Sequence, residues 1–211
     1  MKDLPLTFYT HPMSRGRTIR WMLEETGLAY REVVLDLDVG VKTPEYLAIN
    51  PMGKVPAIQH GQTVITETAA ICAYLAELVP DKGLAPAAGS VERGPYYRWL
   101  FFMAGPVESM VTARQAGAMA PARSAGYGTE ANVLRTLEEA VGRSHYLVAD
   151  RFTAADLVMA AYLSYFMAFG VLEARPGFVE YAQRHTQRAA ALAANARDDA
   201  LLPANVAARG A

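Results

Sequence analysis

Residues 50 to 58 read Asn50-Pro51-Met52-Gly53-Lys54-Val55-Pro56-Ala57-Ile58, and this stretch is the starting point for the fold. A proline that opens a strand removes one backbone donor from the ladder, so we expect an edge strand here. If the Val55–Pro56 bond is cis, the backbone of Val55 faces outward and can pair antiparallel with a short extended peptide. The alternative is an edge-strand proline with no binding role.

The residues before this stretch predict a βαβ unit. Residues 4–9 and 30–35 alternate apolar and polar side chains, as half-buried strands do. Between them, residues 15–26 place apolar side chains at helical spacing, and Gly27 follows as a C-terminal stop. Two strands joined by one helix should be parallel, with a right-handed crossover.

The residues that follow complete a first domain. Thr43-Pro44-Glu45 opens a short helix that ends by Asn50. Residues 55–58 and 63–65 flank a turn and are typical of a β-hairpin, and residues 67–79 return to a helical pattern. The predicted element order for residues 1–80 is therefore β-α-β-α-β-β-α.

The remainder of the chain predicts helices only. Residues 81–90 are rich in Pro, Gly and Ala, as an interdomain linker would be, and residues 91–211 form the predicted all-helical domain. A long helix over 92–119 should kink at Gly105-Pro106. Thr153-Ala154-Ala155-Asp156 has capping-box spacing and should begin a central helix that runs to about Phe169. The other helices are expected at 130–143, 176–185 and 187–194.

Composition excludes several classes of protein. The 211 residues include 20 basic and 21 acidic side chains, a formal net charge of −1, which argues against binding to nucleic acid by bulk electrostatics. Hydrophobic residues make up 52% of the chain, which rules out a disordered polypeptide. A single cysteine, Cys72, rules out an intramolecular disulfide framework and a Cys-rich zinc site. It lies between apolar neighbours in a predicted helix, so we expect a thiol of the core.

Targeting and metal signals are also missing from the sequence. A charge and a proline interrupt any signal-peptide core at the N-terminus, and the longest uncharged stretch, residues 157–172, is shorter than the roughly 20 residues of a membrane span. The four histidines show no metal-ligand spacing. We therefore expect a cytoplasmic protein without a membrane segment or a metal.

Two segments could bind an acidic peptide or stabilise an anion. Glu67-Thr68 begins the third helix, whose unpaired N–H groups and dipole favour a carboxylate; ordinary capping by Thr66 or Thr68 is the alternative. Ser14 lies at the expected start of the first helix, where a hydroxyl could stabilise a thiolate, or could merely cap the helix. Tyr9, at the end of the first strand, is a rival donor that could equally be a packing residue.

Taken together, these residues resemble the soluble, cytosolic-type glutathione S-transferases, especially bacterial members related to the theta, zeta and beta classes. The most specific parts of the resemblance are residues 50–56 and Ile65-Thr66-Glu67-Thr68-Ala69-Ala70-Ile71, with Phe152-Thr153-Ala154-Ala155-Asp156 in the second half. The resemblance covers the whole chain. It implies a thioredoxin-like N-terminal domain, an all-helical C-terminal domain and a homodimer.

The resemblance also implies roles for individual residues. Val55, before a cis Pro56, would pair with the cysteinyl part of glutathione, Glu67 and Thr68 would hold its γ-glutamyl end, and Lys54 would lie near its glycyl carboxylate. Ser14 falls where these classes place the hydroxyl that stabilises the thiolate; tyrosine-type members would point to Tyr9 instead. The remaining implied residues are His11 and Arg15 as substitutes near Ser14, and Met13, Met110 and Arg114 around the electrophile.

Three functions follow as hypotheses. The first is transfer of the glutathione thiolate to small hydrophobic electrophiles, as in detoxification, with glutathione as co-substrate and no metal. The second keeps glutathione as a cofactor for isomerisation or dehalogenation. The third is a non-catalytic binding or regulatory module with the same fold. No cysteine lies near position 14, which makes disulfide reduction through an enzyme thiol a poor fit.

Overall fold

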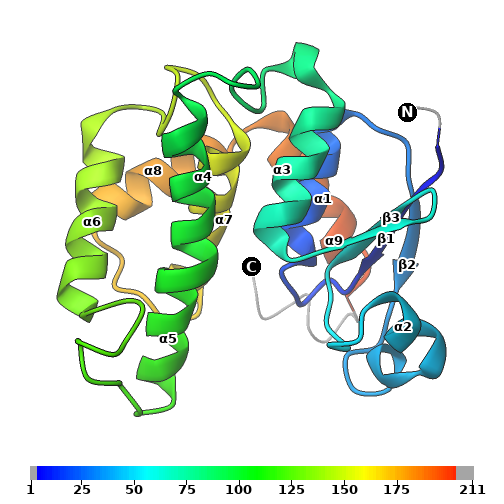
Figure 1. Ribbon diagram of the computed structural model, residues 1–211, viewed down its shortest axis with the longest axis horizontal. Coiled ribbons are helices and arrows are strands. Elements are labelled where there is room, and N and C mark those ends of the chain that lie inside the picture. The colour runs from blue at the N-terminus through cyan, green and yellow to red at the C-terminus, as the bar shows by residue number, and fades with distance from the viewer. Residues whose placement is uncertain (1–3, 203–211) are drawn as a thin grey trace. The chain divides into compact units, whose positions relative to one another are not determined.

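The computed structural model describes residues 4–202 of the chain. These residues form two compact units (Figure 1). The first, called here the N-terminal unit, contains residues 4–78 and the described part of the segment from 189 onward. The second, called the helical unit, contains residues 79–188.

A four-stranded mixed sheet forms the centre of the N-terminal unit. Its strands are β1 (Leu6–Thr10), β2 (Arg31–Val34), β3 (Ala57–His60) and β4 (Thr63–Thr66), in the order β2-β1-β3-β4. β1 pairs parallel with β2 and antiparallel with β3, and β3 pairs antiparallel with β4. This confirms the predicted βαβ unit and the predicted hairpin.

The expectation of an edge strand after Pro56 is wrong. β3 lies between β1 and β4, so it is an interior strand. The proline is tolerated because β3 begins at Ala57, one residue later, and the missing N–H of Pro56 is therefore not required by the ladder.

Helices cover both faces of this sheet. α1 (Gly16–Thr26) and α3 (Thr68–Leu78) pack against one another, and the Arg20 guanidinium of α1 lies over the Phe8 ring of β1. The short helix α2 (Pro44–Ile49) lies on the opposite face, because Tyr46 contacts Tyr9, the strand neighbour of Phe8. A 3₁₀ turn, η1 (Gly40–Lys42), precedes α2. The core between the sheet, α1 and α3 consists of apolar side chains with little or no exposed surface: Phe8, Ile19, Met22, Leu23, Ile58, Ile71 and Leu75.

The helical unit is built around α7. Its elements are η2 (Pro80–Lys82), α4 (Arg93–Phe102), η3 (Met103–Val107), α5 (Glu108–Gln115), α6 (Glu130–Arg143), α7 (Ala154–Ala168) and α8 (Pro176–Thr186). α7 packs against α4 and α8 and carries ten buried residues, which explains why its sequence is apolar all round. The predicted kink at Gly105-Pro106 is a π-helical segment, η3, between α4 and α5.

The predicted capping box of α7 is present. The amide and the hydroxyl of Thr153 each lie 2.9 Å from Oδ2 of Asp156. Oδ1 of Asp156 accepts from the amide of Leu147 and from the hydroxyl of Tyr181, each at 2.7 Å. The buried carboxylate thus connects the start of α7 to the loop before it and to α8.

Two parts of the predicted domain division differ from the structure. α9 (Ala189–Asp199) packs on α1 and belongs to the N-terminal unit, although residues 91–211 were all expected in the helical domain. Local sequence patterns do not indicate this packing because the contact joins segments far apart in the chain. Residues 81–90, the predicted linker, pack on the helical unit: Leu84 is buried, and its carbonyl accepts from the amide of Ala154 at 2.8 Å. Among residues 4–202, no helix is both long and apolar enough to cross a membrane.

Candidate active site

Three loops meet at one end of the sheet. Tyr9 near the end of β1 pairs with Ala57 at the start of β3, and Ala57 pairs with Thr66 at the end of β4. With adjacent strands about 4.8 Å apart, this row spans roughly 10 Å. The segments that continue from it are residues 11–15, residues 50–56 and the Glu67-Thr68 pair. The sheet therefore brings the candidate anion-stabilising and peptide-binding segments to one edge.

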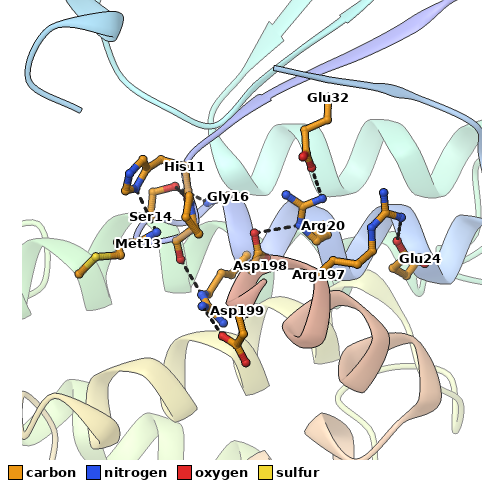
Figure 2. Close-up of polar contacts among 12 residues, drawn as sticks. His11, Met13, Ser14, Gly16, Arg20, Glu24, Glu32, Arg197, Asp198 and Asp199 are labelled. Carbon is orange, nitrogen blue, oxygen red and sulfur yellow. Dashed lines mark hydrogen bonds and ion pairs between the residues drawn. The ribbon is translucent and has the colours of Figure 1, made fainter. Parts of the chain in front are cut away.

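The hydroxyl of Ser14 is held at the N-terminus of α1 (Figure 2). Its Oγ donates to the carbonyl of His11 at 2.7 Å and accepts from the amide of Gly16 at 2.9 Å. Nδ1 of His11 accepts from the amide of Met13 at 3.1 Å, which closes the turn. The helix N-terminus and the Gly16 donor both favour negative charge at this position.

Tyr9 lies on the face of β1 that points away from α1. Its ring packs against Tyr46 with centroids 5.6 Å apart, and its hydroxyl donates to Oε1 of Gln59 at 3.1 Å. The opposite face of β1, which carries Phe8 and Thr10, contacts α1. Ser14 lies beside α1, which covers the face with Phe8 and Thr10, whereas the hydroxyl of Tyr9 bonds Gln59 on the other face.

Two side chains fix the backbone just before Val55. The carbonyl of Lys54 accepts from the hydroxyl of Tyr46 at 2.5 Å and from Nδ2 of Asn50 at 2.8 Å. Burial raises the pKa of Tyr46 to about 12, so this phenol remains a donor at physiological pH. The Val55–Pro56 bond is cis, Val55 is half-buried and Lys54 is exposed.

Glu67 has a backbone conformation that is unusual for its residue type. Its φ is 68°, in the left-handed region that glycine adopts readily and other residues rarely do. The carbonyl of Glu67 accepts from the amide of Ile71 at 2.9 Å, so Glu67 leads directly into α3, whose first residue, Thr68, is buried. Strained residues of this kind cluster at ligand sites.

The remaining predicted residues differ in their surroundings. Arg15 is half-buried at the N-cap position of α1, and Met13 is 54% exposed beside Ser14. In the helical unit, Arg114 pairs with Glu130 at 2.6 Å and so connects α5 to the start of α6. Met110 is completely buried. The role of Met110 and Arg114 beside an electrophile stays a prediction.

The chain's own thiol lies in the core of the N-terminal unit. Cys72 has no exposed surface, and its burial raises the pKa of the thiol far above the ordinary value. It is a core residue, as its apolar sequence context indicated. Within residues 4–202, no group of three or more His, Cys, Asp or Glu side chains is arranged to hold a metal ion.

Sequence reasoning missed Tyr46 and Asn50, the two donors to Lys54. The sequence did contain a pattern that could have indicated both residues. Asn50 is the first residue of the stretch 50–58, and Tyr46 lies four residues before Asn50, on the same face of a helix. It also missed Arg17, whose Nε donates to the carbonyl of Pro12.

A mixed sheet of this order beside α1 and α3, with a cis proline before β3 and a helical domain after it, defines a thioredoxin-like protein of the glutathione transferase type. Comparison of the chain with known protein families supports the same class. The profile of the glutathione S-transferase N-terminal domain matches residues 4–77, and that of the C-terminal domain matches residues 102–189. The chain is a member of the glutathione S-transferase family.

Individual relatives support the same conclusion. Glutathione S-transferase 3 of Zea mays is 32% identical over 166 residues, 72% of this chain and 74% of that protein. A glutathione transferase from Methylococcus capsulatus str. Bath has a TM-score of 0.77 and 27% identity, covering 92% of this chain and 98% of the other. A sphingomonad glutathione S-transferase, solved with glutathione bound, has a TM-score of 0.73 and 29% identity, covering 91% and 98%. These relatives support a glutathione transferase enzyme.

Proposed function

We propose that this protein joins the thiolate of glutathione to small hydrophobic electrophiles. The observation that carries the proposal is the hydroxyl of Ser14, held at the N-terminus of α1 by His11 and Gly16. A free thiol with a pKa of about 8.5 is mostly protonated at neutral pH, whereas the thiolate is the nucleophile. A donor and a helix dipole aimed at the sulfur would lower that pKa.

The proposed reaction has two steps. The thiol of bound glutathione loses its proton to water, and the O–H of Ser14 turns from the His11 carbonyl toward the sulfur while the Gly16 amide still donates to Oγ. The thiolate then forms a C–S bond with the electrophilic carbon, and the leaving group departs with the electron pair of the broken bond. Ser14 keeps its proton throughout, because it acts as a hydrogen-bond donor rather than as an acid.

The other two loops would hold the peptide part of glutathione. The backbone of Val55 is offered for strand-like pairing, next to a carbonyl that Tyr46 and Asn50 fix in place. The start of α3 at Thr68 suits the γ-glutamyl carboxylate, and the carboxylate of Glu67 suits its amino group. Lys54, being exposed, suits the glycyl carboxylate. The sphingomonad relative with bound glutathione supports this choice of co-substrate.

The test compares the two rival hydroxyls. Turnover of glutathione with an activated aryl chloride is measured against pH for the wild type, Ser14→Ala and Tyr9→Phe. We expect Ser14→Ala to lower kcat about 10- to 100-fold and to move the apparent thiol pKa toward 8.5. Tyr9→Phe should retain both. The opposite pattern would overturn the role of Ser14, and product masses would separate conjugation from isomerisation or dehalogenation.

Assembly, compartment and physiological role are further parts of the proposal. We propose a homodimer, supported by exposed aromatic side chains on α4: Phe101 is 60% exposed and stacks with Tyr97, their centroids 6.2 Å apart. Light scattering should then give twice the chain mass of 22.9 kDa, and one chain mass would contradict it.

The cytosol, where glutathione keeps thiols reduced, is the proposed compartment, and detoxification of electrophiles is the proposed role.

A further inference from the structure

Three consecutive charged residues at the end of α9 form ion pairs with α1 (Figure 2). Arg197 pairs with Glu24 at 2.7 Å, Asp198 with Arg20 at 2.9 Å and Asp199 with Arg17 at 2.6 Å. The partners on α1 follow one another at helical spacing of three and four residues, so they share one face. Each residue of the triplet thus binds one successive position of α1.

The central pair fixes the register of the two helices. The side chains of Arg20 and Asp198 are both completely buried, and the guanidinium of Arg20 also contacts Glu32 of β2. Removing one partner of such a pair leaves an uncompensated buried charge, which is strongly unfavourable. The end of α9 is therefore held at a defined position along α1, and Asp199 with it.

The positions of Asp198 and Asp199 are unfavourable for α9 itself. They are the last two residues of the helix, where the dipole favours cations and disfavours carboxylates. Their contacts with arginines of α1 compensate for this. The two aspartates at the C-terminal end of α9 are therefore explained by their ion pairs with α1, because they do not stabilise α9 itself.

Arg17 connects this contact to the loop of Ser14. Its Nε donates to the carbonyl of Pro12 at 2.6 Å, and its Nη2 donates to Oδ1 of Asp199 at 2.6 Å. Pro12 follows His11, whose carbonyl accepts from Ser14. The planar guanidinium makes both bonds from fixed directions, which a lysine could not reproduce. Asp199 therefore orients the group that holds the loop.

We propose that Asp199 is a positioning residue for the hydroxyl of Ser14, acting through Arg17 on the carbonyl of Pro12. This inference rests on the proposed role of Ser14. Without Asp199, the partly exposed guanidinium turns to water and the loop loses a donor. The hydroxyl then samples orientations in which it does not meet the sulfur, which raises the thiol pKa and slows turnover.

The experiment uses a matched pair of variants of the full chain. Asp199→Ala and Glu24→Ala each remove one carboxylate from a partly exposed ion pair between α1 and α9, but only the first pair touches the loop. We expect Asp199→Ala to lower kcat about two- to fivefold, the range of an exposed ion pair, and to raise the apparent thiol pKa, with the KM for glutathione unchanged. Glu24→Ala should change neither kcat nor the pH profile.

Arg17→Lys supplies the second measurement. Because Arg17 and Asp199 act as one unit, the double variant should be no slower than the slower of the two single variants. Thermal unfolding should be alike for Asp199→Ala and Glu24→Ala. Equal effects of Asp199→Ala and Glu24→Ala on the pH profile, or additive losses in the double variant, would overturn the proposal. If Ser14→Ala also leaves the pH profile unchanged, the proposed role of Ser14 fails as well, whereas the absence of a conjugated product would overturn the proposed function itself. If Asp199→Ala leaves the profile unchanged but Ser14→Ala shifts it, only the positioning role of Asp199 is lost.

Discussion

A Cβ atom on residue 16 would lie 2.0 Å from Oγ1 of Thr10, so any residue other than glycine at the start of α1 would force the strand or the helix to shift. Thr10 is completely buried at the end of β1, and the same imagined Cβ would lie 2.9 Å from Oγ of Ser14. The close approach of strand and helix thus places the Ser14 hydroxyl against the Gly16 amide.

Gly16→Ala should therefore reduce both stability and activity. We expect a loss of about 1–3 kcal/mol in the free energy of unfolding, as for overpacked cores, measured by urea denaturation. The added Thr10→Ala change removes the 2.0 Å contact and should restore part of the stability. It leaves the crowding of Ser14, so kcat should stay low. A double variant no more stable than Gly16→Ala would contradict this explanation.

Tyr46→Phe should weaken the binding of glutathione. The change removes one of the two donors to the carbonyl of Lys54 and leaves Asn50 as the other. We expect about 1 kcal/mol of lost stability and a several-fold higher Kd for glutathione by titration calorimetry, because the backbone beside Val55 is less fixed.

The control for Tyr46→Phe is Tyr74→Phe. Tyr74 belongs to the same unit and bonds Nδ1 of His60 at 2.8 Å, away from the Lys54 loop. Its loss should cost similar stability but leave the Kd unchanged. If both variants bind glutathione equally well, the Tyr46 contact does not support the site.

The sequence predicted those features that depend on local pattern. Helix α6 begins and ends where its periodicity predicted, and the capping box of α7 follows from the spacing of Thr153 and Asp156. The register of β3 against β4 could be anticipated because the hairpin turn fixes it.

Features that depend on distant contacts could not be predicted in this way. Pro56 indicated an edge strand, but whether β1 pairs with β3 is decided by packing across the sheet. The place of α9 depends on Arg20, whose burial with Asp198 joins segments far apart in the chain. No local pattern indicates that the guanidinium of Arg20 is completely buried.

Asp156→Ala should destabilise the helical unit more than any surface change. The buried carboxylate accepts from Leu147, Thr153 and Tyr181, and truncation leaves these donors without a partner. We expect a loss of at least about 3 kcal/mol.

The two tryptophans allow this loss to be assigned to one unit. Trp99 lies in the helical unit and Trp21 in the other, so a Trp21→Phe background makes fluorescence report the helical unit. Glu139→Ala, which removes an exposed pair with Arg143, serves as the control and should cost less than about 0.5 kcal/mol. Equal losses in the two variants would show that the capping network contributes little.

His185 should make the stability of the helical unit depend on pH. Burial lowers its pKa, with the nearby charges of Arg184 and Arg188 acting in the same direction and Asp156 opposing them. The ring packs against Tyr181, with centroids 4.6 Å apart. Its Nε2 lies 3.2 Å from the carbonyl of His145, and because a carbonyl can only accept, Nε2 carries the proton of the neutral ring.

The sign of the effect follows from that pKa. The unfolded chain takes up a proton near the ordinary histidine pKa of about 6.5, whereas the folded chain does so only at lower pH. The free energy of unfolding should therefore fall as the pH drops below about 6.5, until the folded pKa is passed. His185→Gln retains a donor for the His145 carbonyl but does not titrate. Measured with Trp99 fluorescence, the variant should lose less stability than the wild type between pH 7.5 and 5.5, and the difference between them should be constant above pH 7.5. Parallel curves throughout would show that His185 does not cause the acid sensitivity.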